Sequence, residues 1–293
     1  MSRSTGRPWQ QRSDVSDFRG QAIVITGGAG GLGREIALLV AARGAAVGIL
    51  DLHVPDAGVS GVTPGGIMAE LDDLGARSLG HSVDVTDESA VRRAVATLEG
   101  ELGPITGLVT AAGGRMVQTD GSTPRLGPEA DQRASAIEME RARRVFDVNV
   151  LGTMITVKAV VPGMVAAGQG RIVTVASVNG LHSRPFGTHA DYAAAKAAVV
   201  QYTRYLAADV GRHGITANCI APGLTLTERS RDRYEGKPEL TRHMALDRLS
   251  TPADQAKAVA FLLSEAADYI TGATLEVSGG TRVAWWGPEP PDA

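Results

Sequence analysis

The sequence contains a single cysteine, Cys219, among its 293 residues. One thiol cannot form a disulfide within the chain, and it cannot bind a metal ion as part of a cysteine cluster. The histidines and carboxylates also lack the spacing of a metal site, so we expect no bound metal. Because a lone cysteine is compatible with a reducing compartment, we expect a cytoplasmic protein.

Long apolar runs and an excess of one charge are also missing. The longest apolar runs, such as residues 36–42, are too short to cross a bilayer, and the polar first residues contain no apolar signal core. Lys and Arg number 29 against 32 Asp and Glu, a net charge of −3 without the basic excess of nucleic-acid binders. We therefore expect neither a membrane nor a nucleic acid as partner.

The chain instead shows a repeated alternation of short apolar segments, rich in β-branched residues, and longer amphipathic segments. The short segments indicate strands buried on both faces, and the longer ones indicate helices. The alternation predicts an α/β fold, a single Rossmann-type doubly wound, mostly parallel sheet of about seven strands with helices on both faces. The expected strands are 22–26, 46–50, 78–83, 107–111, 171–176, 215–220 and 274–277, and the expected helices are 31–43, 64–74, 88–102, 135–161, 190–211 and 252–263.

No linker divides residues 20–281, so we expect one domain, with a flexible leader at 1–19 and a tail at 282–293. Glycine- and proline-containing insertions at 54–66 and 113–133 interrupt the alternation, as binding loops, lids or disordered segments do. Trp285 and Trp286 in the tail are expected to pack at a subunit interface, or alternatively to close a neighbouring substrate pocket.

A glycine-rich string, TGGAGGLG at residues 26–33, ends the first expected strand and opens the first helix. Glycine permits the tight turn and leaves room for a pyrophosphate, which the free N–H groups of the helix then face. Asp51 ends the second strand, where a carboxylate accepts hydrogen bonds from a ribose 2′-hydroxyl and repels a 2′-phosphate. The pattern favours NAD over NADP; the alternative is a structural turn with Asp51 as a strand-end residue.

Four further residues complete a pattern that resembles the short-chain dehydrogenase/reductase family over about residues 20–281. Tyr192 and Lys196 form Y-A-A-A-K, Ser177 follows an expected strand, and Asn149 lies in D-V-N-V. The chain departs from the family where residues 111–113 are Ala-Ala-Gly instead of Asn-Ala-Gly, which puts one sheet-stabilising contact in question.

The resemblance implies an acid/base role for Tyr192. A free tyrosine, with a pKa of about 10, is a poor base at neutral pH, and a cation favours the phenolate. Lys196 is four residues further along the helix, so both side chains lie on one face. The resemblance also implies that Lys196 binds the nicotinamide ribose, Ser177 holds the substrate oxygen, and Asn149 binds a water in a proton relay.

The cofactor site implied by the motifs extends over several strand ends. The resemblance implies that Asp84 touches the adenine, although a role beside a helix cap at Thr86 is an equal alternative. The complete expected set is Gly27, Gly31, Leu32, Gly33, Asp51, Asp84, Val85, Gly113, Tyr192, Lys196, Pro222, Gly223, Thr225 and Thr227.

These features predict an NAD-dependent oxidoreductase that interconverts a small, partly apolar secondary alcohol and its ketone. The alternatives are an NADPH-dependent ketoreductase of the 3-oxoacyl-carrier-protein reductase type and a non-catalytic NAD-binding sensor or scaffold. Because long helices pair subunits in the family, we expect a homotetramer first and a dimer second.

Overall fold

A computed structural model describes residues 17–54, 66–115, 133–184, 187–242 and 244–281. The tail with Trp285 and Trp286 lies outside these residues, as do most of the leader and of both insertions. Phe18, expected in the flexible leader, is fully buried among core residues, and its N–H donates to the carbonyl of Arg43 over 2.9 Å. Phe18 therefore packs with the core although it precedes the expected boundary at residue 20, and the expected domain limits stay a prediction.

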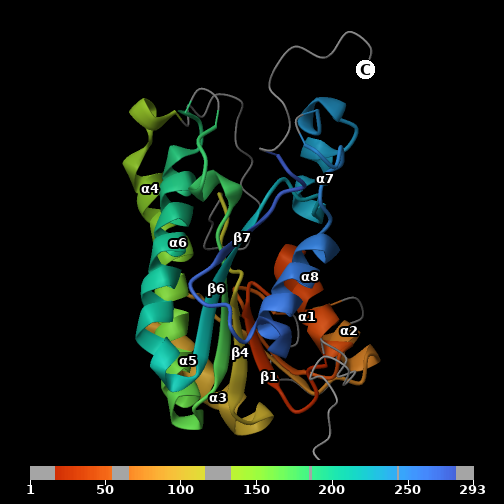
Figure 1. Cartoon of the computed structure of the whole chain (residues 1–293), viewed down its shortest axis with the longest axis vertical. Helices are drawn as coiled ribbons and strands as arrows, with labels where there is room; N and C mark the ends of the chain where they lie inside the picture. The colour runs from red at the N-terminus through yellow and green to blue at the C-terminus, as the bar shows by residue number, and fades with distance from the viewer. Residues whose placement is uncertain (1–16, 55–65, 116–132, 185–186, 243, 282–293) are drawn as a thin grey trace, which may run out of the picture.

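The described strands form one parallel sheet in the order β3-β2-β1-β4-β5-β6-β7, which confirms the expected Rossmann-type architecture (Figure 1). Crossovers run in opposite directions from β1, so the carboxyl ends of β1 and β4 mark the point at which α/β folds bind ligands. The strands are β1 Ala22–Thr26, β2 Ala46–Asp51, β3 Ser78–Ser82, β4 Ile105–Thr110, β5 Gly170–Val175, β6 Ile215–Pro222 and β7 Thr274–Val277.

Helices cover both faces of the sheet, and each face has its own apolar core (Figure 1). One core packs beneath α1 Gly31–Ala41, α2 Ile67–Asp73 and α8 Pro252–Leu263. The other packs beneath α3 Glu88–Leu102, α5 Gly152–Ala167 and α6 Ala190–Val210. Because side chains on both faces of the central strands are buried, these strands are mostly apolar.

The helix expected at 135–161 differs from the prediction. A short 3-10 turn at Ala134–Ala136 precedes α4 Met139–Phe146, and a π-helical turn at Asp147–Leu151 joins α4 to α5. Gly152 donates its N–H to the carbonyl of Asp147, five residues back, which defines the wider turn. The helix ends only at Ala167, where Gly168 takes a left-handed conformation with φ 67°.

Within the described residues, one helical stretch, Met139–Ala167, is long and apolar enough to cross a membrane by length and composition. Its residues Val157, Val160 and Met164 are buried against the sheet, so the fold itself requires much of this apolar character. The expectation of no membrane partner stays a prediction.

Candidate active site at the carboxyl edge of the sheet

The glycine-rich loop after β1 combines close backbone packing with open space. A Cβ on Gly27 would lie 2.8 Å from the backbone of Ala112, and a Cβ on Gly33 would overlap the carbonyl oxygen of Gly27. In contrast, a Cβ on Gly30 or Gly31 would meet no atom within 4 Å. Gly27 and Gly33 thus hold α1 against the sheet, while the start of α1 offers room and N–H groups for a phosphate.

Asp51 lies beside this loop, as expected from its place at the end of β2. Its Oδ2 accepts a hydrogen bond from the N–H of Ala29 over 3.0 Å, and the residue is partly buried. This contact fixes the carboxylate next to the open start of α1. An acidic group held at this distance from a phosphate cradle fits the ribose of a dinucleotide.

Asp84 contacts Thr86 with one of its carboxylate oxygens, but the helix cap expected at Thr86 lies at the next residue. Its Oδ1 accepts hydrogen bonds from the N–H and hydroxyl of Thr86, over 2.9 Å and 2.8 Å. The cap of α3 is Asp87, whose Oδ1 accepts from the N–H of Ala90. The buried side chain of Val85 packs toward Gly152, so a ligand would meet the backbone of Val85. Contact of this segment with an adenine stays a prediction.

Tyr192 and Lys196 lie on one face of α6, with Lys196 Nζ 5.8 Å from the centre of the Tyr192 ring. Lys196 is 5% exposed, and its Nζ donates to the carbonyl of Val175 at the end of β5 over 2.8 Å. Burial lowers the pKa of the Lys196 ammonium to about 8. The charge is held in the interior by its helix neighbours and by one strand-end carbonyl.

The protonation of Tyr192 differs from the expectation. Burial raises the pKa of its phenol, and this effect outweighs the hydrogen bond with Ser177 and the charge of Arg115, which lower it. At neutral pH the chain alone therefore holds Tyr192 as a neutral phenol. We expected the Lys196 charge to lower the pKa of Tyr192, but the groups that lower this pKa are Ser177 and Arg115.

Ser177 and Tyr192 are brought together by the segment that joins β5 to α6. Ser177 is buried, and its Oγ also accepts a hydrogen bond from the N–H of Asn179, which caps the 3-10 turn at Val178–Gly180. Its hydrogen bond with the Tyr192 phenol brings the two motif residues together, and their catalytic roles stay a prediction.

Asn149 lies in the π-helical turn and is fully buried. Its Nδ2 donates to the carbonyls of Gly114 and Val145, and its Oδ1 accepts from the N–H of Gly114 over 3.0 Å. Both amide hydrogens are thus used within the chain. A water relay at this residue would have to use its main-chain carbonyl, which accepts from Thr153 and has a second lone pair.

Gly113 connects the glycine loop to the tyrosine and lysine. A Cβ at Gly113 would lie 2.5 Å from Asn149 Oδ1 and 3.5 Å from Lys196 Nζ. Its neighbour Ala112 donates its N–H to the hydroxyl of Thr26 over 3.1 Å. This bond at the end of β1 ties the segment to the sheet without the asparagine that the family usually has there.

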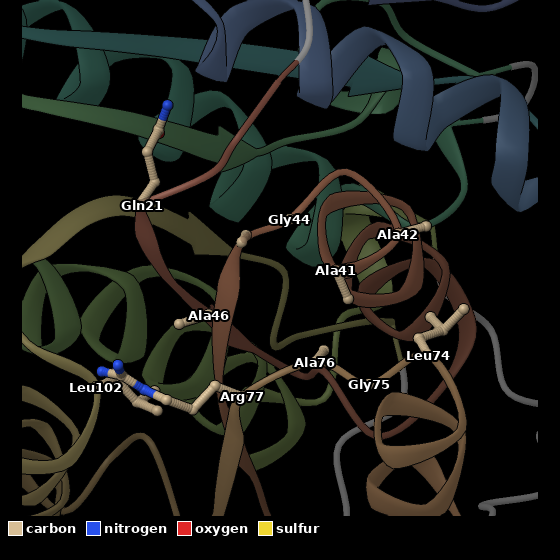
Figure 2. Close-up of a pocket in the computed structure, with 12 residues that line it drawn as sticks. Gln21, Ala41, Ala42, Gly44, Ala46, Leu74, Gly75, Ala76, Arg77 and Leu102 are labelled. Carbon is tan, nitrogen blue, oxygen red and sulfur yellow. The ribbon is translucent and has the colours of Figure 1, made fainter.

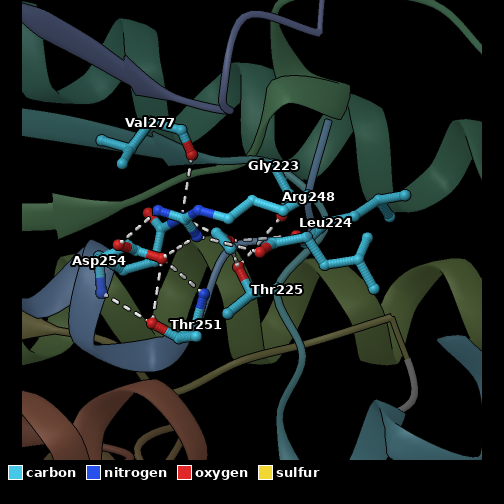
Figure 3. A network of polar contacts seen from close by, with 10 residues as sticks. Gly223, Leu224, Thr225, Arg248, Thr251, Asp254 and Val277 are labelled. Atoms are coloured by element: carbon cyan, nitrogen blue, oxygen red, sulfur yellow. Dashed lines mark hydrogen bonds and ion pairs between the residues drawn. The ribbon is translucent and has the colours of Figure 1, made fainter. Parts of the chain in front are cut away.

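The segment after β6 is fixed by a polar network with α8 and β7 (Figure 3). Arg248 contacts both carboxylate oxygens of Asp254, which also accepts from the N–H and hydroxyl of Thr251. Arg248 and Thr251 hold the pKa of the Asp254 carboxyl well below its usual range. Thr225 shares a 2.8 Å hydrogen bond with Ser250, which places the segment beside the end of β7.

The expected residues Pro222, Gly223, Thr225 and Thr227 all lie along this segment. A Cβ on Gly223 would lie 2.8 Å from the Cα of Ser278, so only glycine fits between the two strand ends. Thr227 caps α7 Glu228–Tyr234 through a reciprocal pair of hydrogen bonds with Ser230. Their contact with a nicotinamide stays a prediction.

A group of polar residues beside Tyr192 was missed by the sequence analysis. Arg115 donates from Nη1 to His189 Nε2 over 2.8 Å and from Nη2 to the hydroxyl of Tyr234 over 3.1 Å. Burial, followed by the charges of Arg115 and Arg184, lowers the pKa of His189 to about 4. Arg115 comes five residues after β4, and this place near a strand's carboxyl end was the available signal.

A cavity of about 400 Å³ lies at the opposite edge, near the starts of β1, β2 and β3 (Figure 2). Small side chains and glycines line most of it, and Arg77 is its one charged lining residue. Arg77 donates to the carbonyl of Glu101. The residues that line this cavity include no acid/base pair.

Comparisons with known proteins agree with this geometry. A family model described as enoyl-(acyl carrier protein) reductase matches residues 27–282. The chain is 37% identical over 278 residues to a cyclohexanol dehydrogenase of Rhodococcus sp. (strain TK6), covering 92% of this chain and 98% of that protein.

Two solved structures show the same architecture. One is a 7α-hydroxysteroid dehydrogenase in complex with NADH and 7-oxo glycochenodeoxycholic acid, with a TM-score of 0.79, 29% identity and coverage of 92% and 96% of the two chains. The other is a 3-oxoacyl-(acyl-carrier protein) reductase from Brucella melitensis with bound NAD, with a TM-score of 0.76, 31% identity and coverage of 96% and 97%. With the fold, the glycine loop and the tyrosine–lysine pair in place, the chain belongs to the short-chain dehydrogenase/reductase family.

Proposed function

We propose that the protein is an NAD-dependent dehydrogenase that interconverts a cyclic secondary alcohol and its ketone. The observation that carries the proposal is the gathering of Tyr192, Ser177 and buried Lys196 next to the glycine loop, linked to it through Gly113. The relative named cyclohexanol dehydrogenase supports a cyclic alcohol as substrate. NAD, when bound, supplies the hydride acceptor for alcohol oxidation.

Ser177, Tyr192 and Lys196 have different roles in the proposed reaction. Ser177 holds the substrate oxygen by a hydrogen bond, and the Tyr192 phenolic oxygen donates its proton to the ketone oxygen in reduction. In oxidation the same oxygen, as phenolate, takes the hydroxyl proton. Lys196 uses one of its three N–H donors on Val175, which leaves two for the ribose hydroxyls and for a relay through the Asn149 carbonyl.

The glycine loop and Asp51 would hold the cofactor. Asp51 favours NAD, because its carboxylate, oriented by the N–H of Ala29, repels a 2′-phosphate. The NADH and NAD complexes of the two similar structures support a nicotinamide dinucleotide at this site. Oxidation of a 3-hydroxyacyl or steroid alcohol in place of a simpler ring alcohol, or reduction of the corresponding ketone, would be a variation of the same chemistry.

We also propose a cytoplasmic homotetramer. Met139, Phe146 and Leu151, on the helical stretch that includes α4 and α5, and Tyr205 on α6 are exposed large apolar side chains of the kind that subunit contacts bury. The buried free thiol of Cys219 suits a reducing compartment. Light scattering of the purified protein would report the mass of the assembly.

The first experiment is a thermal-shift titration with NAD⁺, NADH, NADP⁺ and NADPH, because a ligand that binds only the native state raises its stability. NAD(H) should raise the melting temperature and NADP(H) should not. A larger shift with NADP(H) would favour the ketoreductase alternative, and no shift with any of them would contradict a dinucleotide site.

The second experiment replaces Tyr192 by phenylalanine, with Tyr269→Phe at a fully exposed tyrosine as control. Loss of the acid/base group should lower kcat for cyclohexanol by about 10²- to 10⁴-fold and leave NAD⁺ binding nearly unchanged. Turnover that survives in Tyr192→Phe would remove the catalytic assignment, and a non-catalytic NAD-binding protein would then be the better explanation.

A further inference from the structure

Two arginines lie together beside the tyrosine, although they are far apart in the sequence. Arg115 follows β4, and Arg184 lies between β5 and α6; both are partly buried. Tyr234 of α7 accepts a hydrogen bond from Arg115 and is an electrostatic neighbour of Arg184. Three separate segments therefore converge on one positively charged spot.

Neither arginine has a carboxylate partner among the residues that the structure describes. The described hydrogen-bond partners of Arg115 are the Tyr234 hydroxyl and His189, whose pKa is lowered to about 4, and neither side chain is a carboxylate. Nearby Arg141, by contrast, pairs with the buried carboxylate of Asp191 at 3.2 Å. Burial and the charge of Arg115 together lower the pKa of Arg184, which reflects an uncompensated pair of like charges.

His189 adds a further hydrogen-bond donor to the same spot. An arginine can only donate, so His189 Nε2 accepts from Arg115 and the proton of the neutral imidazole resides on Nδ1. This Nδ1 is buried and has no hydrogen-bond partner within the described part of the chain. Among the described residues, the spot thus offers guanidinium and imidazole donors that have no anionic acceptor.

His189 links the spot to the start of α6, the helix that carries Tyr192. The main-chain carbonyl of His189 accepts a hydrogen bond from the N–H of Ala193 in the first turn of α6. His189 itself is three residues before Tyr192 in the sequence. Arg115 is close enough to the Tyr192 phenol to shift its pKa, and so is Tyr234. A group held here would be part of the molecule whose alcohol or ketone faces Tyr192.

We propose that Arg115 and Arg184 form an anion-binding subsite, and that the substrate is a secondary alcohol or ketone that carries a carboxylate, sulfonate or phosphate group. The planar guanidinium fork matches such oxygens in pairs, and Arg115 keeps three of its five N–H donors beyond the two described contacts. An anion here would compensate two charges at once. The inference rests on the proposed function, because it places the anion on the substrate of the Tyr192 site.

Binding is measured first, since it does not require turnover. The protein is titrated by calorimetry with cyclohexanecarboxylate and with the neutral cyclohexanecarboxamide, each with and without NADH. The carboxylate should bind at least about tenfold more tightly than the amide, the range for a hydrogen bond to a charged group. Cyclohexanesulfonate and cyclohexyl phosphate, titrated in the same way, identify the preferred anion.

Arg184→Met should remove about 10- to 100-fold of the carboxylate affinity. The matched control is Arg231→Met, which removes a charge from the exposed surface of α7 and should leave the carboxylate-to-amide ratio within about twofold, because exposed charges are strongly screened. Arg184→Lys keeps the positive charge but lacks the planar guanidinium group, so it should bind the carboxylate with an intermediate affinity. This variant provides the test if Arg184→Met does not fold.

A second readout uses turnover of 3-hydroxycyclohexanecarboxylate and its methyl ester. The ratio of their kcat/KM values should favour the acid and should fall in Arg184→Met. Equal binding of carboxylate and amide to the wild-type protein, or an unchanged ratio in the folded Arg184 variants, would overturn the subsite. Failure of NADH to bind, or of either alcohol to react, would instead count against the proposed function, and the titrations without NADH would still report on the anion.

Discussion

Replacing Lys196 by methionine is expected to stabilise the free protein at neutral pH while abolishing its activity. The Lys196 ammonium is 5% exposed, and its pKa is lowered to about 8 by burial. A fall from the ordinary value of 10.5 corresponds to roughly 3 kcal/mol of unfavourable free energy for keeping this charge in the folded chain. Methionine has a similar length and no charge to desolvate.

The gain is reduced by the hydrogen bond that the ammonium donates to Val175. Losing a hydrogen bond to a charged group removes about 1.5 to 3 kcal/mol, so we expect a net stabilisation of about 1 kcal/mol. The pH dependence gives the sharper test. Because the folded pKa lies below the unfolded one, the penalty is complete below pH 8, declines as the pH rises, and vanishes above about 10.5.

The assay is urea denaturation of the wild type and the variant without cofactor at pH 7 and pH 10. The free energy of unfolding of Lys196→Met should exceed that of the wild type at pH 7, and this advantage should shrink or reverse at pH 10. Lys158→Met, at an exposed lysine of α5 paired with Glu88, is the control and should show no such trend. A difference between wild type and Lys196→Met that is the same at both pH values would refute the assignment of a strained, buried ammonium.

Three further outcomes are expected. Gly33→Ala should destabilise the protein by about 1 to 3 kcal/mol in urea denaturation and weaken NAD⁺ binding, since its Cβ would overlap the Gly27 carbonyl oxygen; an unchanged midpoint would show that α1 does not pack so tightly. Thr251→Ala should cost about 1 kcal/mol by the same assay, because Thr251 caps α8 reciprocally with Asp254. Asp51→Ser should raise NADP⁺ affinity about tenfold in thermal-shift titrations by removing the charge that repels a 2′-phosphate; unchanged selectivity would separate Asp51 from cofactor choice.

The strands were predictable from the sequence because their burial leaves a simple signature. β1 is buried at every residue, and β6 at nearly every one, so their apolar runs could be recognised without knowledge of their neighbours. The start of α8 is predictable in the same way from Thr251, Pro252 and Asp254, because a helix cap is formed by residues close in sequence. Signals of this kind are local, and the structure confirms them.

The π-helical turn at Asn149 was not predictable in the same way. Nothing in the residues of Asp147–Leu151 distinguishes this turn from an ordinary helix. The turn is accompanied by two hydrogen bonds between the Asn149 side chain and the backbone of Gly114, which is 35 residues away in the sequence. The protonation of Tyr192 also depends on distant neighbours, since burial and Arg115 set it together with Ser177. Helical spacing placed Lys196 on the correct face of α6 but could not describe its surroundings.

The three residues Gly113, Gly114 and Arg115 join positioning and recognition in one short segment after β4. Gly113 fits against Asn149 and Lys196, Gly114 binds the Asn149 amide, and Arg115 reaches His189 and the spot beside Tyr192. The segment that follows it, residues 116–132, falls within the insertion that separates this chain from the family pattern. Because two hydrogen bonds join Gly114 to the Asn149 side chain, the same backbone contacts position the catalytic-site asparagine and the start of the Arg115 side chain.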